Sequence, residues 1–174
     1  MTAARRRDEI LQALAGASGP VSAAALAARL GVSRQVVVGD VALLRAAGSP
    51  IVATPRGYVL GGGQEGSGVR CTVACRHGLD GLLDELYTVA DCGCGVLDVT
   101  VEHPVYGQLS GQLQVFSRYD ADVFWDALQK NGAQPLCSLT GDIHLHTLMC
   151  PDEARKARVL AALEEKGYLM GLEK

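Results

Sequence analysis

The sequence predicts an α+β protein of two domains: an N-terminal winged helix-turn-helix joined to a ferredoxin-like βαββαβ sandwich with an extra C-terminal helix. Three observations predict this class. Helical patterns separated by a glycine turn fill the first third of the chain, the glycine-rich run GGGQEGSG follows Leu60, and strand and helix patterns then alternate. A chain of 174 residues is long enough for two small domains.

The first two helices are predicted by apolar spacing and by their end residues. In RRRDEILQALAG, Ile10, Leu11 and Leu14 recur at helical spacing. Ser22 can cap a second helix that runs to Leu30, and Gly31 can end it in the left-handed conformation that glycine tolerates. The expected buried side of this helix consists of Ala24, Leu26, Ala27 and Leu30.

A third helix is expected to begin after Ser33, with Val37, Val41 and Leu44 as its inner stripe. This arrangement is a helix-turn-helix, whose second helix fits the major groove of DNA. Arg34 and Gln35 stand at its start, where arginine can bond guanine and glutamine can bond adenine. Ser33 and the helix N-terminus can hold a phosphate.

The segment PIVATPRGYVL predicts a two-stranded wing, with strands at 51–53 and 58–60 and Arg56 at its tip. The DNA-contact residues are therefore predicted to be Ser33, Arg34, Gln35 and Arg56. The distribution of charge also favours DNA contact by this domain, because residues 1–60 have a formal charge of +4, whereas the remainder has −7 and the whole chain −3. The alternative is a small helical protein-interaction domain with the same pattern.

The domain boundaries are predicted as 1–62 for the winged helix, 63–68 for a glycine-rich linker and 69–174 for the second domain. A phosphate-binding loop is the weaker interpretation of the glycine run, because no lysine follows in the required pattern.

A cytoplasmic location is the expectation from the sequence. No run of eighteen apolar residues is present, so a membrane span is not expected, and MTAARRRDEI lacks the apolar core of a signal peptide. Without export, the six cysteines are expected to be free thiols.

The second domain is predicted to contain four strands and three helices. The expected strands are 70–76, 95–102, 109–117 and 143–149, and the expected helices are 79–91, 120–131 and 151–167. In the strand 95–102, Val96, Asp98, Thr100 and Glu102 are expected on one face and Leu97, Val99 and Val101 on the other. The last helix is expected to start at Pro151 with two acids in its first turn.

The segment GDIHLHTL offers a candidate metal site. His144 and His146 share one face of the predicted strand, about 7 Å apart, while Ile143 and Leu145 are expected to face the core. His77 closes the first strand and Glu85 lies on the next helix, so both can converge on this pair. Three imidazoles and a carboxylate suit nickel, zinc, iron or cobalt. The alternative is a polar strand face with exposed histidines.

Two further patterns, one of cysteines and one of a histidine with a tyrosine, are candidates for binding sites. Cys71, Cys75, Cys92 and Cys94 have spacings unlike the usual zinc-binding pairs, which favours buried or loop thiols. In VEHPVYGQL, a rigid turn presents His103 and Tyr106, a combination that suits a flat heteroaromatic ligand. The alternative is a simple turn with a packed tyrosine.

The chain resembles the niacin-responsive repressors of bacterial NAD-biosynthesis genes, in which a winged helix-turn-helix precedes a "3H" domain. The matching stretches are SRQVVVGDVALLRAAG at 33–48, LDVTVEHPVYGQL at 97–109 and LTGDIHLHTL at 139–148, and the resemblance covers nearly the whole chain. It implies one divalent transition metal, with ligands at His77, Glu85, His144 and His146, and nicotinic acid as co-repressor. It also implies that His103 and Tyr106 are effector-pocket residues. The sequence departs from the family pattern at Gly39, which replaces a polar residue, and at Asp142, which replaces a glycine often found there, and Cys92 and Cys94 are particular to this chain.

The leading functional prediction is a non-enzymatic repressor of NAD-biosynthesis or niacin-uptake genes. It would bind operator double-stranded DNA as a homodimer, with nicotinic acid sensed by a domain that holds nickel, zinc or iron. The alternative is a metal-dependent, amidase-like hydrolase fused to a DNA-binding domain, because three histidines and a glutamate can activate water. A third possibility is a structural dimer with incidental metal.

Overall fold

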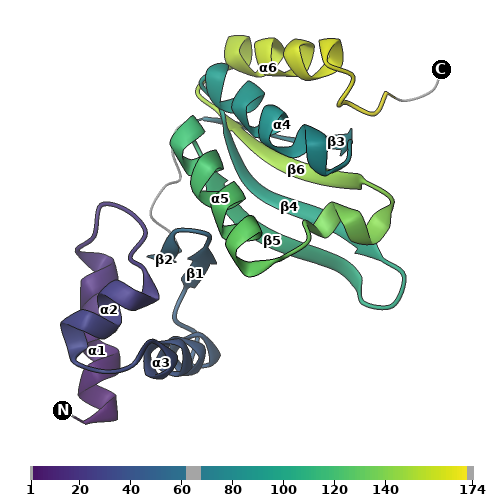
Figure 1. Ribbon diagram of the computed structural model, residues 1–174. Helices are drawn as coiled ribbons and strands as arrows, with labels where there is room; N and C mark the ends of the chain where they lie inside the picture. The colour runs from purple at the N-terminus through teal and green to yellow at the C-terminus, as the bar shows by residue number, and fades with distance from the viewer. Residues whose placement is uncertain (1, 62–67, 172–174) are drawn as a thin grey trace. The chain divides into compact units, whose positions relative to one another are not determined.

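The computed structural model describes residues 2–61 and 68–171, which form two compact units, Met1–Glu65 and Gly66–Lys174 (Figure 1). The predicted linker 63–68 falls almost wholly outside the described residues, so its boundaries stay a prediction. No helix in the described part of the chain combines the length and apolar character needed to cross a membrane.

The first unit is built from three helices, α1 (Ala3–Ala15), α2 (Ala23–Leu30) and α3 (Arg34–Ala46). Ser22 and Ser33 cap α2 and α3 as predicted, because their side chains accept hydrogen bonds from the backbone N–H groups of Ala25 and Val36. Gly31 ends α2 with φ = 65°. The predicted inner stripe of α3 is confirmed, since Val37, Val41 and Leu44 are buried.

One prediction for α2 was wrong. Ala23 is buried, whereas the predicted Ala24 is exposed. Apolar spacing cannot distinguish two adjacent alanines, and the packing of Leu26, Ala27 and Leu30 in the core fixes the rotation of the helix.

The predicted wing is present as β1 (Ile51–Thr54) and β2 (Gly57–Leu60), paired antiparallel with Thr54 opposite Gly57. The side chain of Thr54 donates to the carbonyl of Gly57 and accepts from the backbone N–H of Arg56, which fixes the turn. Ile51 packs into the same core as the three helices.

The second unit has the predicted element order βαββαβα. Its strands are β3 (Val69–Arg76), β4 (Gly95–His103), β5 (Gly107–Val115) and β6 (Ile143–Cys150), and its helices are α4 (Leu79–Asp91), α5 (Arg118–Asn131) and α6 (Glu153–Glu165). The four strands pair antiparallel in the order β3-β6-β4-β5. Strand β6 thus lies between β3 and β4, the strands that α4 joins, which is a split βαβ arrangement. The predicted fold class is confirmed.

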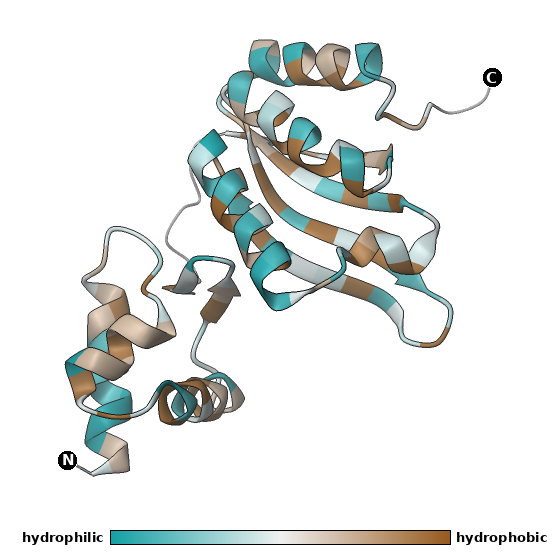
Figure 2. Ribbon diagram, in the orientation of Figure 1, coloured by the Kyte–Doolittle hydropathy of each residue, from teal (hydrophilic) through white to brown (hydrophobic). Residues whose placement is uncertain are grey.

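All three helices of this unit lie on one side of the sheet (Figure 1). Their inner faces share one core with the sheet, which includes Leu86 of α4, Ala121 of α5 and Val159 of α6. Figure 2 shows the corresponding alternation of apolar and polar residues along helices and strands.

Two expectations for the strands of this unit were wrong in detail. His144 and His146, rather than Ile143 and Leu145, face the helices: the histidines are 2% and 4% exposed, whereas Ile143 is 41% exposed. A register shift between Val96 and Asp98 brings Val96 onto the same face as Val99 and Val101, so the predicted strict alternation fails.

The last helix begins at Glu153 rather than at Pro151, because Asp152 is its N-cap and accepts from the N–H of Arg155 at 2.7 Å. Two elements had no prediction. The short 3-10 helix η1 (Leu136–Thr140) precedes β6, and Leu169 pairs with Cys75 along the free edge of β3.

Candidate metal centre and DNA-contact surface

His77, Glu85, His144 and His146 converge beneath α4. Strand β3 ends at Arg76, and α4 begins immediately after His77 and Gly78, which places Glu85 on the side of the helix that faces the sheet. In the β3–β6 pairing, His144 lies opposite Cys75 and His146 lies opposite Val73. The predicted closeness of the first and last strands is therefore present, and it brings the four predicted ligands together.

The carboxylate of Glu85 stands at the centre of this cluster. Its Oε2 atom lies 2.6 Å from Nε2 of His77, 3.3 Å from Nε2 of His144 and 3.2 Å from Nε2 of His146. Glu85 is 1% exposed, and its second oxygen, Oε1, is buried without a hydrogen-bond partner. A buried carboxylate oxygen without a partner is costly, so the site favours an additional cationic or donor group.

The other nitrogen of each imidazole is held by a backbone carbonyl. Nδ1 of His77 lies 2.9 Å from the oxygen of Gly78, Nδ1 of His144 lies 3.1 Å from that of Asp142, and Nδ1 of His146 lies 2.6 Å from that of Asp98. A carbonyl only accepts, so each Nδ1 carries a proton, and in a neutral imidazole each Nε2 then presents a lone pair. This outer hydrogen bond is the usual way in which proteins orient a metal-binding histidine.

Electrostatics favour a cation in the same place. Burial alone would raise the pKa of Glu85, but the charge of His146 and the hydrogen bonds from the three histidines hold it well below its usual value. Burial lowers the pKa values of His77 and His146, yet the hydrogen bond and charge of Glu85 outweigh it, and both pKa values are raised. Protonated His77 and His146 beside one carboxylate would leave excess positive charge in the core. The nitrogen and oxygen donors therefore fit a divalent transition metal that replaces these protons.

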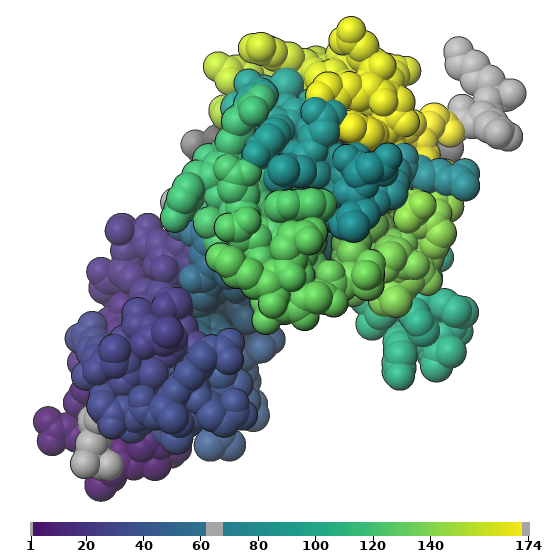
Figure 3. Space-filling view, in the orientation of Figure 1, coloured from purple at the N-terminus to yellow at the C-terminus, as the bar shows by residue number. Residues whose placement is uncertain are grey.

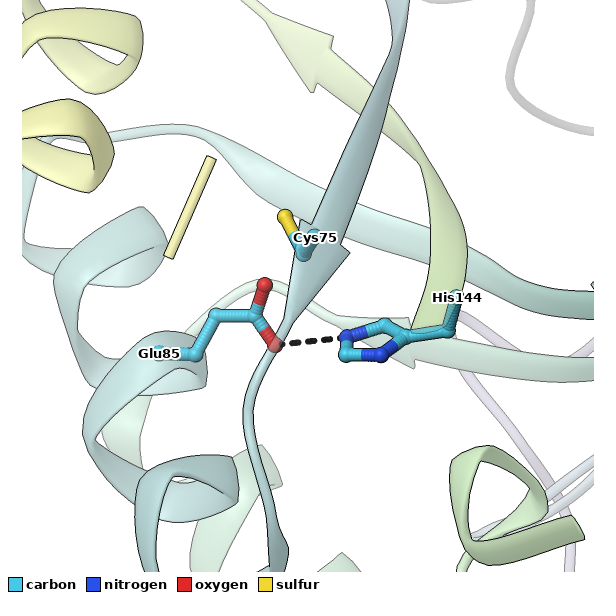
Figure 4. A group of neighbouring side chains, drawn as sticks. All are labelled: Cys75, Glu85 and His144. Atoms are coloured by element: carbon cyan, nitrogen blue, oxygen red, sulfur yellow. Dashed lines mark hydrogen bonds and ion pairs between the residues drawn. The ribbon is translucent and has the colours of Figure 1, made fainter. Parts of the chain in front are cut away.

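Cys75 also belongs to this neighbourhood. One ligand atom from each of Cys75, Glu85 and His144 lies within 4.8 Å of the other two (Figure 4). Burial and the charge of Glu85 raise the pKa of the Cys75 thiol. The sequence placed Cys75 only in a rival group of four cysteines, whereas in the structure it lies with Glu85 and His144.

Three further residues support the cluster, and the sequence analysis did not assign them this role. Gly81 of α4 lies against the His77 ring, and the ring of Tyr168 packs edge-on against His77 at 5.0 Å between centroids. Asp142 adopts φ = 70°, and its carbonyl oxygen accepts from Nδ1 of His144 and from the backbone N–H of His77. A glycine inside a helical pattern can indicate close packing, and this feature of the sequence could have identified Gly81. Tyr168 lies beyond the predicted last helix and gave none.

A small cavity of about 30 Å³ adjoins the cluster. Its remaining walls are mostly apolar and include Leu82, Leu86, Val99, Leu113, Phe124 and Leu136. This volume is roughly that of one water molecule and far below the several hundred Å³ of typical ligand pockets. The cavity in this structure is therefore too small to hold a ligand of ordinary size.

His103 and Tyr106 lie elsewhere. They occupy the tip of the β4–β5 hairpin, which projects at the lower right of Figure 3. Nδ1 of His103 accepts from the backbone N–H groups of Val105 and Tyr106, and Tyr106 is 73% exposed. Neither residue lines the cavity beside Glu85. Their role in effector binding stays a prediction.

In the first unit, the predicted DNA-contact residues lie on one exposed region. Arg34 and Gln35 are exposed at the start of α3, immediately after Ser33. Arg34 and Arg56 also border one surface hollow of about 330 Å³, together with Ser22 at the start of α2. Two cations on a concave surface beside a helix N-terminus suit a phosphate backbone.

Not every arginine of the basic segment is available to DNA. Nε of Arg6 lies 2.5 Å from Oδ2 of Asp40, and Nη1 of Arg7 lies 3.6 Å from Oδ1 of the same residue. Asp40 is 4% exposed, so these two arginines neutralise a buried carboxylate and tie α1 to α3.

Comparison with known proteins matches both units. Residues 70–172 match the 3H domain, and residues 6–59 match a helix-turn-helix domain. The chain is 44% identical over 165 residues to the probable transcription repressor NiaR of Thermotoga maritima, covering 95% of this chain and 93% of that protein. It is 40% identical over 169 residues to the transcription repressor NadR of Bacillus subtilis, covering 96% and 94%.

Proposed function

The chain belongs to the family of niacin-responsive transcription repressors that join a helix-turn-helix domain to a 3H domain, and we propose that it represses genes of NAD biosynthesis or niacin uptake with nicotinic acid as co-repressor. Both relatives are named as repressors, which supports a regulatory rather than an enzymatic role. The observation that carries the sensing part of the proposal is the convergence of three Nε2 atoms on Oε2 of Glu85.

One nickel, zinc or iron ion would be held by His77, Glu85, His144 and His146. When bound, the metal would supply a Lewis-acidic position for a carboxylate or a pyridine nitrogen. The protein contributes the orientation of the ligands, because the backbone carbonyls of Gly78, Asp142 and Asp98 fix the three rings.

The apolar residues around the cavity suit a flat ring beside this position. Val99 and Leu113 from the sheet and Phe124 from α5 can pack against a pyridine ring, while the cluster meets its carboxylate. Because the cavity is small, nicotinic acid can enter only if neighbouring elements move, and η1 contributes Leu136 to the wall. Binding energy would thereby be coupled to a conformational change, which is what a co-repressor requires.

DNA binding would use α3 in the major groove and the wing beside it. Arg34 and Gln35 would read base edges, while Ser33 and Arg56 would contact phosphates. Two copies would be needed to match two operator half-sites, so the active form would be a homodimer.

The decisive experiment is calorimetric titration of nicotinic acid into the full-length protein, with metal and after chelation. We expect binding that requires metal, and we expect nicotinic acid to tighten operator binding at fixed salt. Absence of binding in both states would refute the assigned effector. Binding that survives both chelation and His144→Ala would refute the metal-based sensor.

A further inference from the structure

We propose that Cys75 is an additional ligand of the metal, so that this chain adds a sulfur donor to its imidazole and carboxylate donors. This inference rests on the metal site proposed above. It adds a residue that the predicted ligand set of His77, Glu85, His144 and His146 does not contain.

Geometry is the first support. One ligand atom from each of Cys75, Glu85 and His144 lies within 4.8 Å of the other two. Two atoms bound to one zinc ion at about 2.0–2.3 Å lie no more than about 4.6 Å apart. Only a small adjustment would therefore allow these three atoms to share an ion.

Strand pairing explains why the sulfur lies there. Cys75 is directly opposite His144 in the β3–β6 register, so both side chains project from the same face of the sheet. Figure 4 shows the Cys75 side chain above one oxygen of the Glu85 carboxylate and the His144 ring to the right, joined to the other oxygen by the dashed line. The position is set by two paired strands and not by a mobile loop.

The orphaned oxygen of Glu85 is the second, independent support. Oε1 is buried and lacks a hydrogen-bond partner, whereas Oε2 already contacts all three histidines. Among the described residues no ion pair of Oε1 is found, and the Cys75 thiol lies on that side of the carboxylate. Cys75, which is 0% exposed, places its sulfur within 4.8 Å of ligand atoms of Glu85 and His144.

Coordination would have a chemical consequence. Cysteine binds metal as thiolate, so metal uptake would release the thiol proton to solvent in addition to any protons lost from the imidazoles. A thiolate also favours zinc, nickel, cobalt or iron over magnesium, calcium or manganese. The site would therefore select soft or borderline metals more strongly than three histidines and a glutamate do.

Cobalt(II) loaded into the full-length protein provides a direct test, because a cobalt–thiolate bond gives a sulfur-to-metal charge-transfer band in the near ultraviolet. We expect this band in the wild-type protein and its loss in Cys75→Ala. The control is Cys137→Ala, since Cys137 is buried like Cys75 and lines the cavity beside Glu85, which Cys75 does not. The control should keep the band. We also expect Cys75→Ala to bind zinc more than about tenfold more weakly, at least the loss typical of removing an outer-shell partner.

X-ray absorption of the zinc-loaded wild-type protein removes any dependence on folding of the variant, because sulfur at about 2.3 Å differs from nitrogen or oxygen at about 2.0–2.2 Å. A wild-type protein that binds metal without sulfur in its first shell would overturn the role of Cys75 and leave the proposed sensor intact. A band that persists in Cys75→Ala but disappears in Cys137→Ala would assign the sulfur to Cys137 and overturn the proposal. Failure of the wild-type protein to bind any of these metals would overturn both.

Discussion

Gly81 lies directly against His77: a Cβ placed on Gly81 would come within 2.9 Å of both Cβ and Cγ of His77. Since Gly81 sits inside α4, the absence of a side chain there is what allows the His77 ring to settle on the helix and reach Glu85. The close contact with His77 thus explains a glycine that weakens the helix by about 1 kcal/mol relative to alanine.

Gly81→Ala should therefore weaken metal binding even though alanine is the better helix former. We expect at least a tenfold loss of affinity, about the effect of disturbing the orientation of a ligand. Competition with a chelating dye measures it. Gly39→Ala is the matched control, because a Cβ there meets nothing within 4 Å, and it should leave metal affinity unchanged. Equal affinities of wild type and Gly81→Ala would contradict the role assigned to Gly81.

Gly39 itself yields a second prediction. It is exposed in the middle of α3, and neither packing nor a left-handed φ requires glycine there. Gly39→Ala should stabilise the protein by about 0.5–1 kcal/mol through helix propensity. If Gly39 serves close approach of α3 to DNA, the same variant should bind operator more weakly. Urea unfolding and operator titration at one salt concentration measure both effects, and unchanged operator binding would show that the glycine serves no such approach.

The arginines of the first unit separate into structural and DNA-binding groups. Arg6→Ala would remove the closer of the two arginines that pair with the buried Asp40, so we expect a clear loss of unfolding free energy. Arg34→Ala should leave stability within about 0.5 kcal/mol of wild type and weaken operator binding. Loss of operator binding in Arg6→Ala with unchanged stability would reverse the first assignment.

Local signals predicted the elements well because they reside in the residues that form them. The serine caps and Gly31 predicted where α2 begins and ends and where α3 begins. The HxH spacing predicted a shared face for His144 and His146. The orientation of that face could not be predicted, because hydropathy assigns Ile143 to the core. His144 and His146 are buried in place of Ile143 because their Nε2 atoms contact the buried carboxylate of Glu85.

Contacts that depend on tertiary packing gave no signal along the chain. The proximity of Cys75 to Glu85 follows from the β3–β6 register, and the contact of Tyr168 with His77 follows from the C-terminal segment pairing with β3. The buried pairing of Arg6 with Asp40 joins two helices separated by a third. Sequence spacing specifies which residues share a face, whereas only the packed structure specifies which faces meet.

Asp142 occupies a position suited to glycine, because its φ of 70° is in the left-handed region. Asp142→Gly should keep metal affinity, since the orienting carbonyl remains, and should change stability by no more than about 1 kcal/mol. Asp142→Val should destabilise by more than about 1 kcal/mol and weaken metal binding, because a β-branched residue resists this conformation. Metal titration and urea unfolding of both variants distinguish the roles of backbone and side chain. Reduced affinity in Asp142→Gly would assign a role to the carboxylate instead.

Metal removal should reverse the pH dependence of stability. In the metal-free protein, Glu85 raises the pKa values of His77 and His146 above the ordinary 6.5 against the opposing effect of burial. Protonated histidines then stabilise the fold below pH 6.5, and this contribution is lost as pH rises through the raised pKa values. The lowered pKa of Glu85 acts oppositely: its contribution is present above the ordinary 4.5 and is lost as pH falls through the folded value. Urea unfolding of chelated protein should therefore show greatest stability between about pH 4.5 and 6.5 and a decline above it.

The metal-loaded protein should lack this decline, because a metal binds the deprotonated imidazoles and is favoured as protons leave. Glu85→Gln provides the control: it removes the carboxylate that contributes most to raising the two histidine pKa values against burial, so the decline above pH 6.5 should become smaller in the chelated protein. A chelated wild-type protein whose unfolding free energy stays constant or increases above pH 6.5 would mean that Glu85 does not hold these histidines protonated. The close approach of Nε2 of His77 and of His146 to the Glu85 carboxylate would then need an explanation other than protonation of these histidines.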